Sequence, residues 1–277
     1  MMEKKKQNLV YLFICMFAVA ALFFCKTTVR AEGMVVKVGK QYVRCTDNNT
    51  VLRVSDTKSG TGKKIVTLKS GRIGRFCVDS GRIYYSVNFT KGSSTSSKIY
   101  SLRTDGTGKK YYRSFARDTF VEAYYKGELY LTAAFYDGTI LAYESTYRLN
   151  LKTKKVTSVK KGYGVRWEDT IEGNYLFLGQ FKYDADQTTS VYSVNIKNGK
   201  VKLLDTQISS VVQQIGSYVY YARRQDGKIR VYCSRPDGSK KTAKTPWFRA
   251  TNVKKFTEKY AEYYPPYENP KRRYYNS

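Results

Sequence analysis

The stretch from Gly81 to Lys110 contains GRIYY at residues 81–85 and KIYSLRTDGTGKK at residues 98–110. Its apolar runs predict two strands, and the Asp-Gly turn after the second run predicts a hairpin to a further strand. The same phrase, a glycine with an aromatic-rich run and then a second run of strand type, returns five times. Its glycines are residues 39, 81, 127, 173 and 216, which are 42 to 46 residues apart. A period of that length filled with strands is typical of a β-propeller array.

The second repeat divides into four strands, at residues 75–78, 83–87, 98–103 and 109–113. Such a unit cannot bury its apolar face alone and must pack on its neighbours. We therefore predict an all-β propeller of five to six four-stranded blades, spanning residues 32–264. The repeat units begin near residues 34, 75, 120, 166 and 211. Residues 247–264 are predicted to open a partial sixth unit, with a short capping helix as the alternative, and residues 265–277 to form a flexible basic tail.

The N-terminus has the pattern of a secretory signal peptide. Three lysines at residues 4–6 precede an apolar run over residues 9–25, and Val29-Arg30-Ala31 provides a cleavage site after Ala31. The alternative is an uncleaved anchor, for which the run is at the short limit for spanning a bilayer. In either case the main domain is expected to be exported, as a secreted or cell-surface protein. Any contact with the membrane would come only from a retained signal segment.

The chain is strongly basic, with 50 Lys and Arg against 22 Asp and Glu. Cleavage after Ala31 would leave a net charge of +24. Charge of that size favours polyanionic partners. We expect an anionic polysaccharide, a cell-wall polymer or a protein as the partner, and export argues against nucleic acid. The alternative is that surface lysines protect strand edges and keep a β-rich protein soluble.

The residue inventory argues against several kinds of chemistry. The chain has no histidine, which excludes Ser-His and Cys-His nucleophile pairs. The spacing of Cys45, Cys77 and Cys233 fits no metal template, and we interpret them as small buried hydrophobes, with a Cys45–Cys77 bridge as the alternative. No catalytic residue, metal site or cofactor is predicted. Acids that could act in glycoside hydrolysis, but are expected to be surface charges, are Glu122, Glu168, Asp169 and Glu172.

Two of the units carry a resemblance to a known family. GRIYY and KIYSLRTDGTGKK at residues 81–110, with YVYY and RVYCSRPDGSKK at residues 218–241, resemble secreted bacterial propellers of unknown function. These are similar to the β-propeller of low-density-lipoprotein-receptor-related proteins. The resemblance covers most of residues 34–245 and implies a fold without supplying catalytic residues. Family members usually look six-bladed, and the calcium-binding and cysteine-rich modules that flank the receptor propellers are absent from this sequence.

One face of the predicted propeller combines long loops with arginines. The connections between second and third strands, at residues 88–97, 135–145 and 182–189, are long, and binding tends to occur on such loops. Crossovers between repeats place arginine beside an aromatic residue on the same face. Guanidinium pairs with carboxylate or phosphate in bidentate fashion, and aromatic faces stack on sugar rings. The predicted ligand-binding residues are Arg75, Arg117, Arg166, Trp167, Trp247 and Arg249, and the alternative is that they serve blade packing.

These patterns favour an exported, non-catalytic binding propeller that recognises an anionic polymer, glycan or protein through its long-loop face. One alternative is a carbohydrate-active enzyme of glycosidase or lyase type on the same scaffold, which needs two or three acids clustered at the channel mouth. Another is a structural cell-surface scaffold, which needs no concave polar site. Propellers host many unrelated functions, so the fold by itself does not choose among the three.

Overall fold

The computed structural model describes residues 35–137, 140–165, 174–180, 189–208, 213–215 and 217–249. The predicted signal peptide, the basic tail and residues 250–264 of the predicted sixth unit lie outside these ranges. The described residues form strands and turns, and they include no helix of the length and hydropathy needed to cross a membrane.

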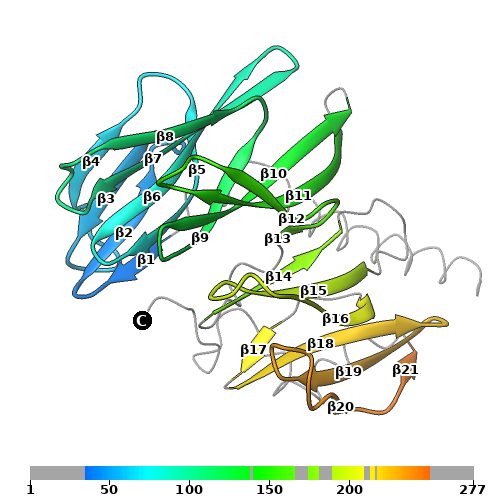
Figure 1. Ribbon diagram of the computed structural model, residues 1–277. Coiled ribbons are helices and arrows are strands. Elements are labelled where there is room, and N and C mark those ends of the chain that lie inside the picture. Colours follow the sequence, from blue (N-terminus) through cyan, green and yellow to red (C-terminus); the bar gives the residue numbers. More distant parts are fainter. Residues whose placement is uncertain are drawn as a thin grey trace, which may run out of the picture.

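The strands form antiparallel sheets that follow one another in chain order (Figure 1). The first blade contains β1 (Val35–Val38), β2 (Gln41–Thr46), β3 (Val51–Ser55) and β4 (Lys63–Thr67). The second contains β5 (Arg72–Asp79), β6 (Arg82–Lys91), β7 (Ser94–Arg103) and β8 (Lys110–Phe115), and the third contains β9 (Thr119–Tyr125), β10 (Glu128–Asp137), β11 (Ile140–Asn150) and β12 (Val156–Lys160). In each of these blades the four strands are hydrogen-bonded in sequence order, which confirms the predicted four-stranded unit.

The fourth and fifth blades share one nine-stranded sheet, because β16 pairs with β18 at Ile208 and Arg223. The fourth contains β13 (Gly164–Val165), β14 (Tyr175–Gly179), β15 (Thr189–Asn195) and β16 (Val201–Ile208). The fifth contains β17 (Gln213–Ile215), β18 (Tyr218–Gln225), β19 (Lys228–Ser234), β20 (Thr242–Ala243) and β21 (Phe248–Arg249). Both β20 and β21 pair with the outer edge of β19, so two short segments together take the place of a fourth strand.

In the second and third blades the repeated glycine completes the turn between the first and second strands. Ser80 and Gly81 have φ angles of 46° and 73°, and Lys126 and Gly127 have φ angles of 45° and 85°. Two successive residues with positive φ are what a two-residue turn needs to match the twist of its flanking strands. Glycine adopts this conformation without steric cost, which explains its place in these two turns.

The apolar faces of successive blades form the core. Leu52 and Tyr85 belong to the cluster between the first and second blades, and Leu129 to the cluster between the second and third. Tyr130 and Leu176 join the third blade to the fourth. Further along, Phe177, Val219 and Tyr221 join the fourth blade to the fifth. Each blade therefore buries its apolar faces on its neighbours, as the repeat predicts.

The structure contradicts two of the three predicted long loops. Residues 88–97 belong to a hairpin in which β6 and β7 stay paired as far as Lys91 and Ser94. Residues 135–145 likewise continue the pairing of β10 with β11 to Asp137 and Ile140. Both hairpins project beyond the neighbouring strands at the upper edge in Figure 1. The third, at residues 182–189, lies almost entirely outside the described residues.

The three cysteines of the described chain are free thiols, so the alternative of a Cys45–Cys77 bridge is wrong. Cys45 and Cys233 are buried, as expected of small hydrophobic residues. Burial, followed by the charges of Asp79 and Glu122, raises the pKa of Cys77 far above its usual value. The Cys77 thiol therefore stays protonated, as a packing group rather than a nucleophile.

Candidate functional site

Arg75 lies between two blades rather than at an open surface. It is on β5, and its Nη1 atom is 2.5 Å from Oε1 of Glu122 on β9. The guanidinium also lies over the ring of Phe120, 5.2 Å from its centroid. The Glu122 side chain is only 2% exposed, so its predicted role as a surface charge is wrong. This partly desolvated ion pair joins the first strands of the second and third blades.

The other predicted residues are spread over the molecule. Arg117 is in the connection between β8 and β9, where its guanidinium lies over the ring of Phe135 on β10. Trp247 directly precedes β21 and Arg249 belongs to it, at the outer edge of the fifth blade. Trp247 lies 5.9 Å from the guanidinium of Arg230. Arg166 and Trp167 lie outside the described residues, as do three of the acids considered above.

A cleft between the second and third blades gathers a different set of residues. It has a volume of about 610 Å³ and opens beside the turns that precede β10 and β12. The cleft is lined by four cations, four tyrosines and two other residues: Arg82, Lys110, Lys152, Lys154, Tyr84, Tyr111, Tyr112, Tyr124, Gly127 and Leu151. We call it the tyrosine–lysine cleft. No acidic residue belongs to its lining.

The tyrosines of the cleft are held against one another. The rings of Tyr84 on β6 and Tyr124 on β9 stack with centroids 4.5 Å apart, and the ring of Tyr112 on β8 lies 6.5 Å from that of Tyr84. The hydroxyl of Tyr112 is 2.9 Å from Oγ of Ser101. Burial raises the pKa of Tyr84 far above its usual value, and the neighbouring tyrosines add to the shift. The Tyr84 hydroxyl therefore stays neutral and can donate a hydrogen bond.

The four cations fall into two kinds. Arg82 donates from Nη1 to Oγ of Ser101 and to the carbonyl of Gly108, and Nζ of Lys154 donates to the carbonyl of Leu151. Lys154 also lies 4.3 Å from the centroid of the Tyr112 ring. These two are fixed parts of the wall.

Lys110 and Lys152 are different, because neither ammonium group has a hydrogen bond or ion pair with any described residue. Both side chains belong to exposed residues at the rim of the cleft. An ammonium group carries three donors, so these two lysines present free positive charge to a ligand.

The sequence contained a signal for this site that the repeat pattern concealed. Lys109-Lys110-Tyr111-Tyr112 opens the outer strand of the second blade, and Lys152-Thr153-Lys154-Lys155 forms a turn of the third. Interpreting tyrosines as packing residues is correct for Tyr84, which is buried, and wrong for Tyr111, which is 54% exposed. Only the structure shows that the two segments meet across a blade junction.

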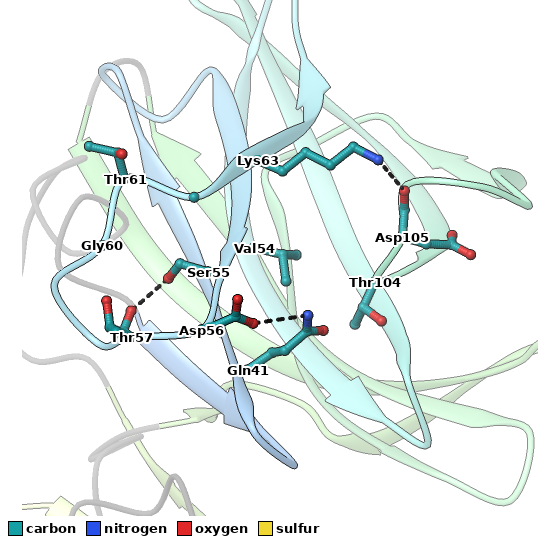
Figure 2. Close-up of a pocket in the computed structure, with 11 residues that line it drawn as sticks. Gln41, Val54, Ser55, Asp56, Thr57, Gly60, Thr61, Lys63, Thr104 and Asp105 are labelled. Carbon is teal, nitrogen blue, oxygen red and sulfur yellow. Dashed lines mark hydrogen bonds between the residues drawn. The ribbon is translucent and has the colours of Figure 1, made fainter.

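A second pocket lies at the equivalent position between the first and second blades, but it is lined by different kinds of side chain (Figure 2). This pocket of about 570 Å³ is lined by the hydroxyls of Ser55 and Thr57, by two carboxylates, Asp56 and Asp105, and by Lys63. Gln41 donates to Asp56 over 3.4 Å, and Nζ of Lys63 donates to the carbonyl of Asp105. Its polar groups are largely engaged with one another, so it is a poorer receptor for an anion.

Metal binding has no support in the described part of the chain, which contains no group of three or more Cys, Asp and Glu side chains able to hold an ion. The tyrosine–lysine cleft instead offers cations and hydroxyls to a ligand. Such a set attracts negative charge and donates hydrogen bonds to it, and the lining includes no carboxylate.

Neither a protein-family model nor a curated protein matches this chain. Among solved structures, the Pyrococcus horikoshii acylaminoacyl peptidase aligns with a TM-score of 0.51 at 16% identity over 76% of this chain. Our chain spans only 38% of the length of that peptidase. A putative TolB from Agrobacterium tumefaciens, at 12% identity, aligns with a TM-score of 0.49, covering 76% of this chain and 78% of the TolB.

A nidogen/laminin complex aligns with a TM-score of 0.44 at 14% identity, covering 80% of this chain and 81% of the matched one. At such identities, a likeness to the peptidase bears on the fold alone. With the blade-by-blade sheets described above, it shows that the chain is an all-β propeller.

Proposed function

We propose that this chain is an exported, non-catalytic propeller that binds an anionic polymer in the tyrosine–lysine cleft. One observation carries the proposal: the ammonium groups of Lys110 and Lys152 have no partner among the described residues, in a cleft whose lining includes no acid. Unpaired cations that line the same concave surface give an anion both attraction and a defined position. The segment 1–31, with its signal-peptide pattern, supports export.

The cleft fits a binder better than an enzyme. A glycosidase needs two carboxyl groups on opposite sides of the scissile bond. The lining offers none, and Glu122, an acid considered for that role, is bound to Arg75. The exposed ring of Tyr111 and the two free lysines instead resemble the mixed apolar and cationic surface that an acidic glycan or wall polymer would contact.

The test is a paired lysine substitution with a charge-matched control. Lys110→Gln with Lys152→Gln removes both free ammonium groups from the cleft. Lys197→Gln with Lys200→Gln removes two exposed lysines from the corresponding turn of the fourth blade, with the same change of net charge. Binding of dextran sulfate by residues 32–277 would be measured by titration calorimetry at low and at physiological salt.

We expect the cleft variant to lose about tenfold in affinity, because each lost charge contact contributes roughly 0.5–1 kcal/mol and 1.4 kcal/mol is a factor of ten. The control should lose no more than about threefold, the part due to net charge alone, and that part should shrink as salt screens it. Equal losses in the two variants would show that dextran sulfate binds nonspecifically and that the cleft is not the site.

A further inference from the structure

Arg117 lies over an aromatic ring, and its donors are not used by any residue that the structure describes. Its guanidinium lies 4.1 Å from the centroid of Phe135, the shortest such distance for an arginine in the described chain. No described residue accepts a hydrogen bond from this guanidinium or forms an ion pair with it. The side chain is half-buried. A planar fork of five N–H donors is thus fixed in orientation and still free to bind.

The backbone that carries Arg117 is fixed as well. Its carbonyl oxygen lies 2.9 Å from Oγ of Ser97, which also accepts a hydrogen bond from the amide of Thr119 at 2.8 Å. The amide of Asp118 donates to Oγ1 of Thr95 at 3.2 Å. Thr95 and Ser97 belong to β7 in the long hairpin of the second blade, so that hairpin positions the arginine. A ligand would therefore find the guanidinium already placed, without an ordering cost.

The neighbouring carboxyl group does not neutralise the arginine. Oδ2 of Asp118 accepts a hydrogen bond from the hydroxyl of Tyr136 at 3.2 Å, and it forms no ion pair with Arg117. Burial raises the pKa of Asp118, although the Tyr136 hydroxyl opposes the shift. The carboxyl group thus binds Tyr136 of the β10–β11 hairpin, and no acid among the described residues pairs with Arg117.

Exposed aromatic rings continue from the arginine. Phe135 stacks on Tyr143 with centroids 4.4 Å apart and an angle of 12° between the rings. Tyr143 is 37% exposed and Tyr136 is 41% exposed, both on the projecting β10–β11 hairpin. Rigid aromatic residues at the tip of a supported hairpin provide contact area at low entropic cost. The surface therefore combines one bidentate cation with open apolar ring surface.

This surface is separate from the tyrosine–lysine cleft. The cleft is beside Gly127, just before β10 begins, whereas Phe135 is near the far end of the same strand. Eight residues of extended strand correspond to roughly 25 Å. The two surfaces thus lie at opposite ends of the third blade and can be tested separately.

We infer that Arg117, with the aromatic rings of the β10–β11 hairpin, forms a second binding site, specific for the carboxylate of an acidic sugar. The guanidinium fork matches the two coplanar oxygens of a carboxylate. Tyr143 stacks on Phe135 beyond the arginine, so its open ring face is available to a further sugar of the same oligosaccharide. A flexible polyphosphate would use the charge and leave the ring faces unused. The inference does not depend on the function proposed for the cleft.

The test uses short ligands, which cannot bridge the two surfaces. Trigalacturonate carries carboxylates on sugar rings, maltotriose is the neutral analogue, and tripolyphosphate is the anion without a ring. Affinities would be measured by titration calorimetry for the wild type, Arg117→Lys, Tyr143→Ala, and the control Lys197→Gln with Lys200→Gln, whose exposed lysines belong to the fourth blade. Arg117→Lys keeps the positive charge and removes the bidentate fork. Circular dichroism would establish that each variant is folded.

We expect Arg117→Lys to lower the affinity for trigalacturonate about tenfold or more, because a charged hydrogen bond contributes about 1.5–3 kcal/mol. Tyr143→Ala should lower it as well, and Lys197→Gln with Lys200→Gln should remain within about twofold, since these lysines belong to neither surface. No measurable binding of trigalacturonate, equal affinity in Arg117→Lys and wild type, or tighter Arg117-dependent binding of tripolyphosphate would each overturn the assignment.

Discussion

The tyrosine–lysine cleft and the junction between the third and fourth blades occupy equivalent places and carry opposite chemistry. Arg82 opens β6 and Glu128 opens β10, each directly after the repeated glycine. The next strand of each blade differs as well. In the second blade Ser101 pairs with Tyr84, whereas in the third blade Arg148 pairs with Tyr130. At the third blade Glu128 and Arg148 form an ion pair of 3.2 Å. At the second blade the cation remains without an acid.

The tyrosine at this position also differs in its surroundings. The hydroxyl of Tyr130 donates to the carbonyl of Ile196 in the next blade at 3.1 Å, and the side chain is completely buried. Tyr84 instead contributes to the wall of an open cleft. Lys110, opposite Ser101 on the outer strand, corresponds to Thr157, opposite Arg148. A few side chains on one scaffold thus decide whether a junction is a packed core or a cationic recess.

The largest effect should come from the packed junction. Tyr130→Ala removes a fully buried ring, and we expect it to lower the free energy of unfolding by about 3–5 kcal/mol. Tyr111→Ala removes an exposed ring from the cleft and should change it by less than about 1 kcal/mol. Urea titrations would measure both. Tyr130→Phe is the control: it loses only the hydroxyl bond and should cost about 1 kcal/mol. Similar losses for Tyr130→Ala and Tyr111→Ala would contradict the comparison.

Local features of this fold could be predicted from the sequence because they depend on a few adjacent residues. The turn at Ser80 and Gly81 and the strands on either side follow from glycine's tolerance of positive φ and from alternating apolar residues. The hairpin of residues 88–97 could not, since its Ser, Thr and Gly content is typical of a loop. Its strand pairing depends on Thr95 and Ser97, whose hydroxyls bind the next crossover.

The candidate sites were harder to predict because their parts are far apart in the chain. Arg75 and Arg117 both have an aromatic neighbour, yet only the structure shows that Glu122, 47 residues later, binds the first and that no acid binds the second. Likewise Lys110 and Lys152 meet only through the packing of two blades. A repeat pattern predicts the position of each residue within its blade. It does not predict which residue of the next blade lies against it, and the chemistry of a site at a blade junction depends on that contact.

The second effect concerns binding, and it brings the acid of one junction into the other. Arg82→Glu places in the second blade the acid that Glu128 provides in the third. Ser101 is left unchanged because it is completely buried. We expect dextran sulfate binding to fall about tenfold, because the cleft loses a cation and the new acid repels the polymer. The free energy of unfolding should fall by about 1–2 kcal/mol, since the hydrogen bonds from Arg82 to Ser101 and Gly108 are lost. Unchanged binding would show that Arg82 and its surroundings do not shape the site.

The smallest effect should come from the pocket between the first and second blades, where an acid takes part in the lining. Oδ1 of Asp105 accepts hydrogen bonds from the amide and the hydroxyl of Thr107, both at 2.7 Å, and these bonds lower the pKa of Asp105 below its usual 3.8. A lowered pKa means that the ionised form stabilises the fold. That contribution is present above the unfolded pKa and is lost as pH falls through the folded pKa.

Asp105→Asn keeps an acceptor oxygen and removes the charge, so the wild type should be slightly more stable at neutral pH. The difference should disappear as the pH falls below about 4. Thermal melting from neutral to acidic pH would measure it. Asp237→Asn in the fifth blade is the matched control, because Asp237 accepts the same two bonds from Ser239 and its pKa is also lowered. Asp237 also lies 3.7 Å from Nζ of Lys202, so a larger loss of stability in Asp237→Asn than in Asp105→Asn would measure the contribution of that lysine. A difference from wild type that stays constant with pH would contradict the assignment of the lowered pKa to this turn.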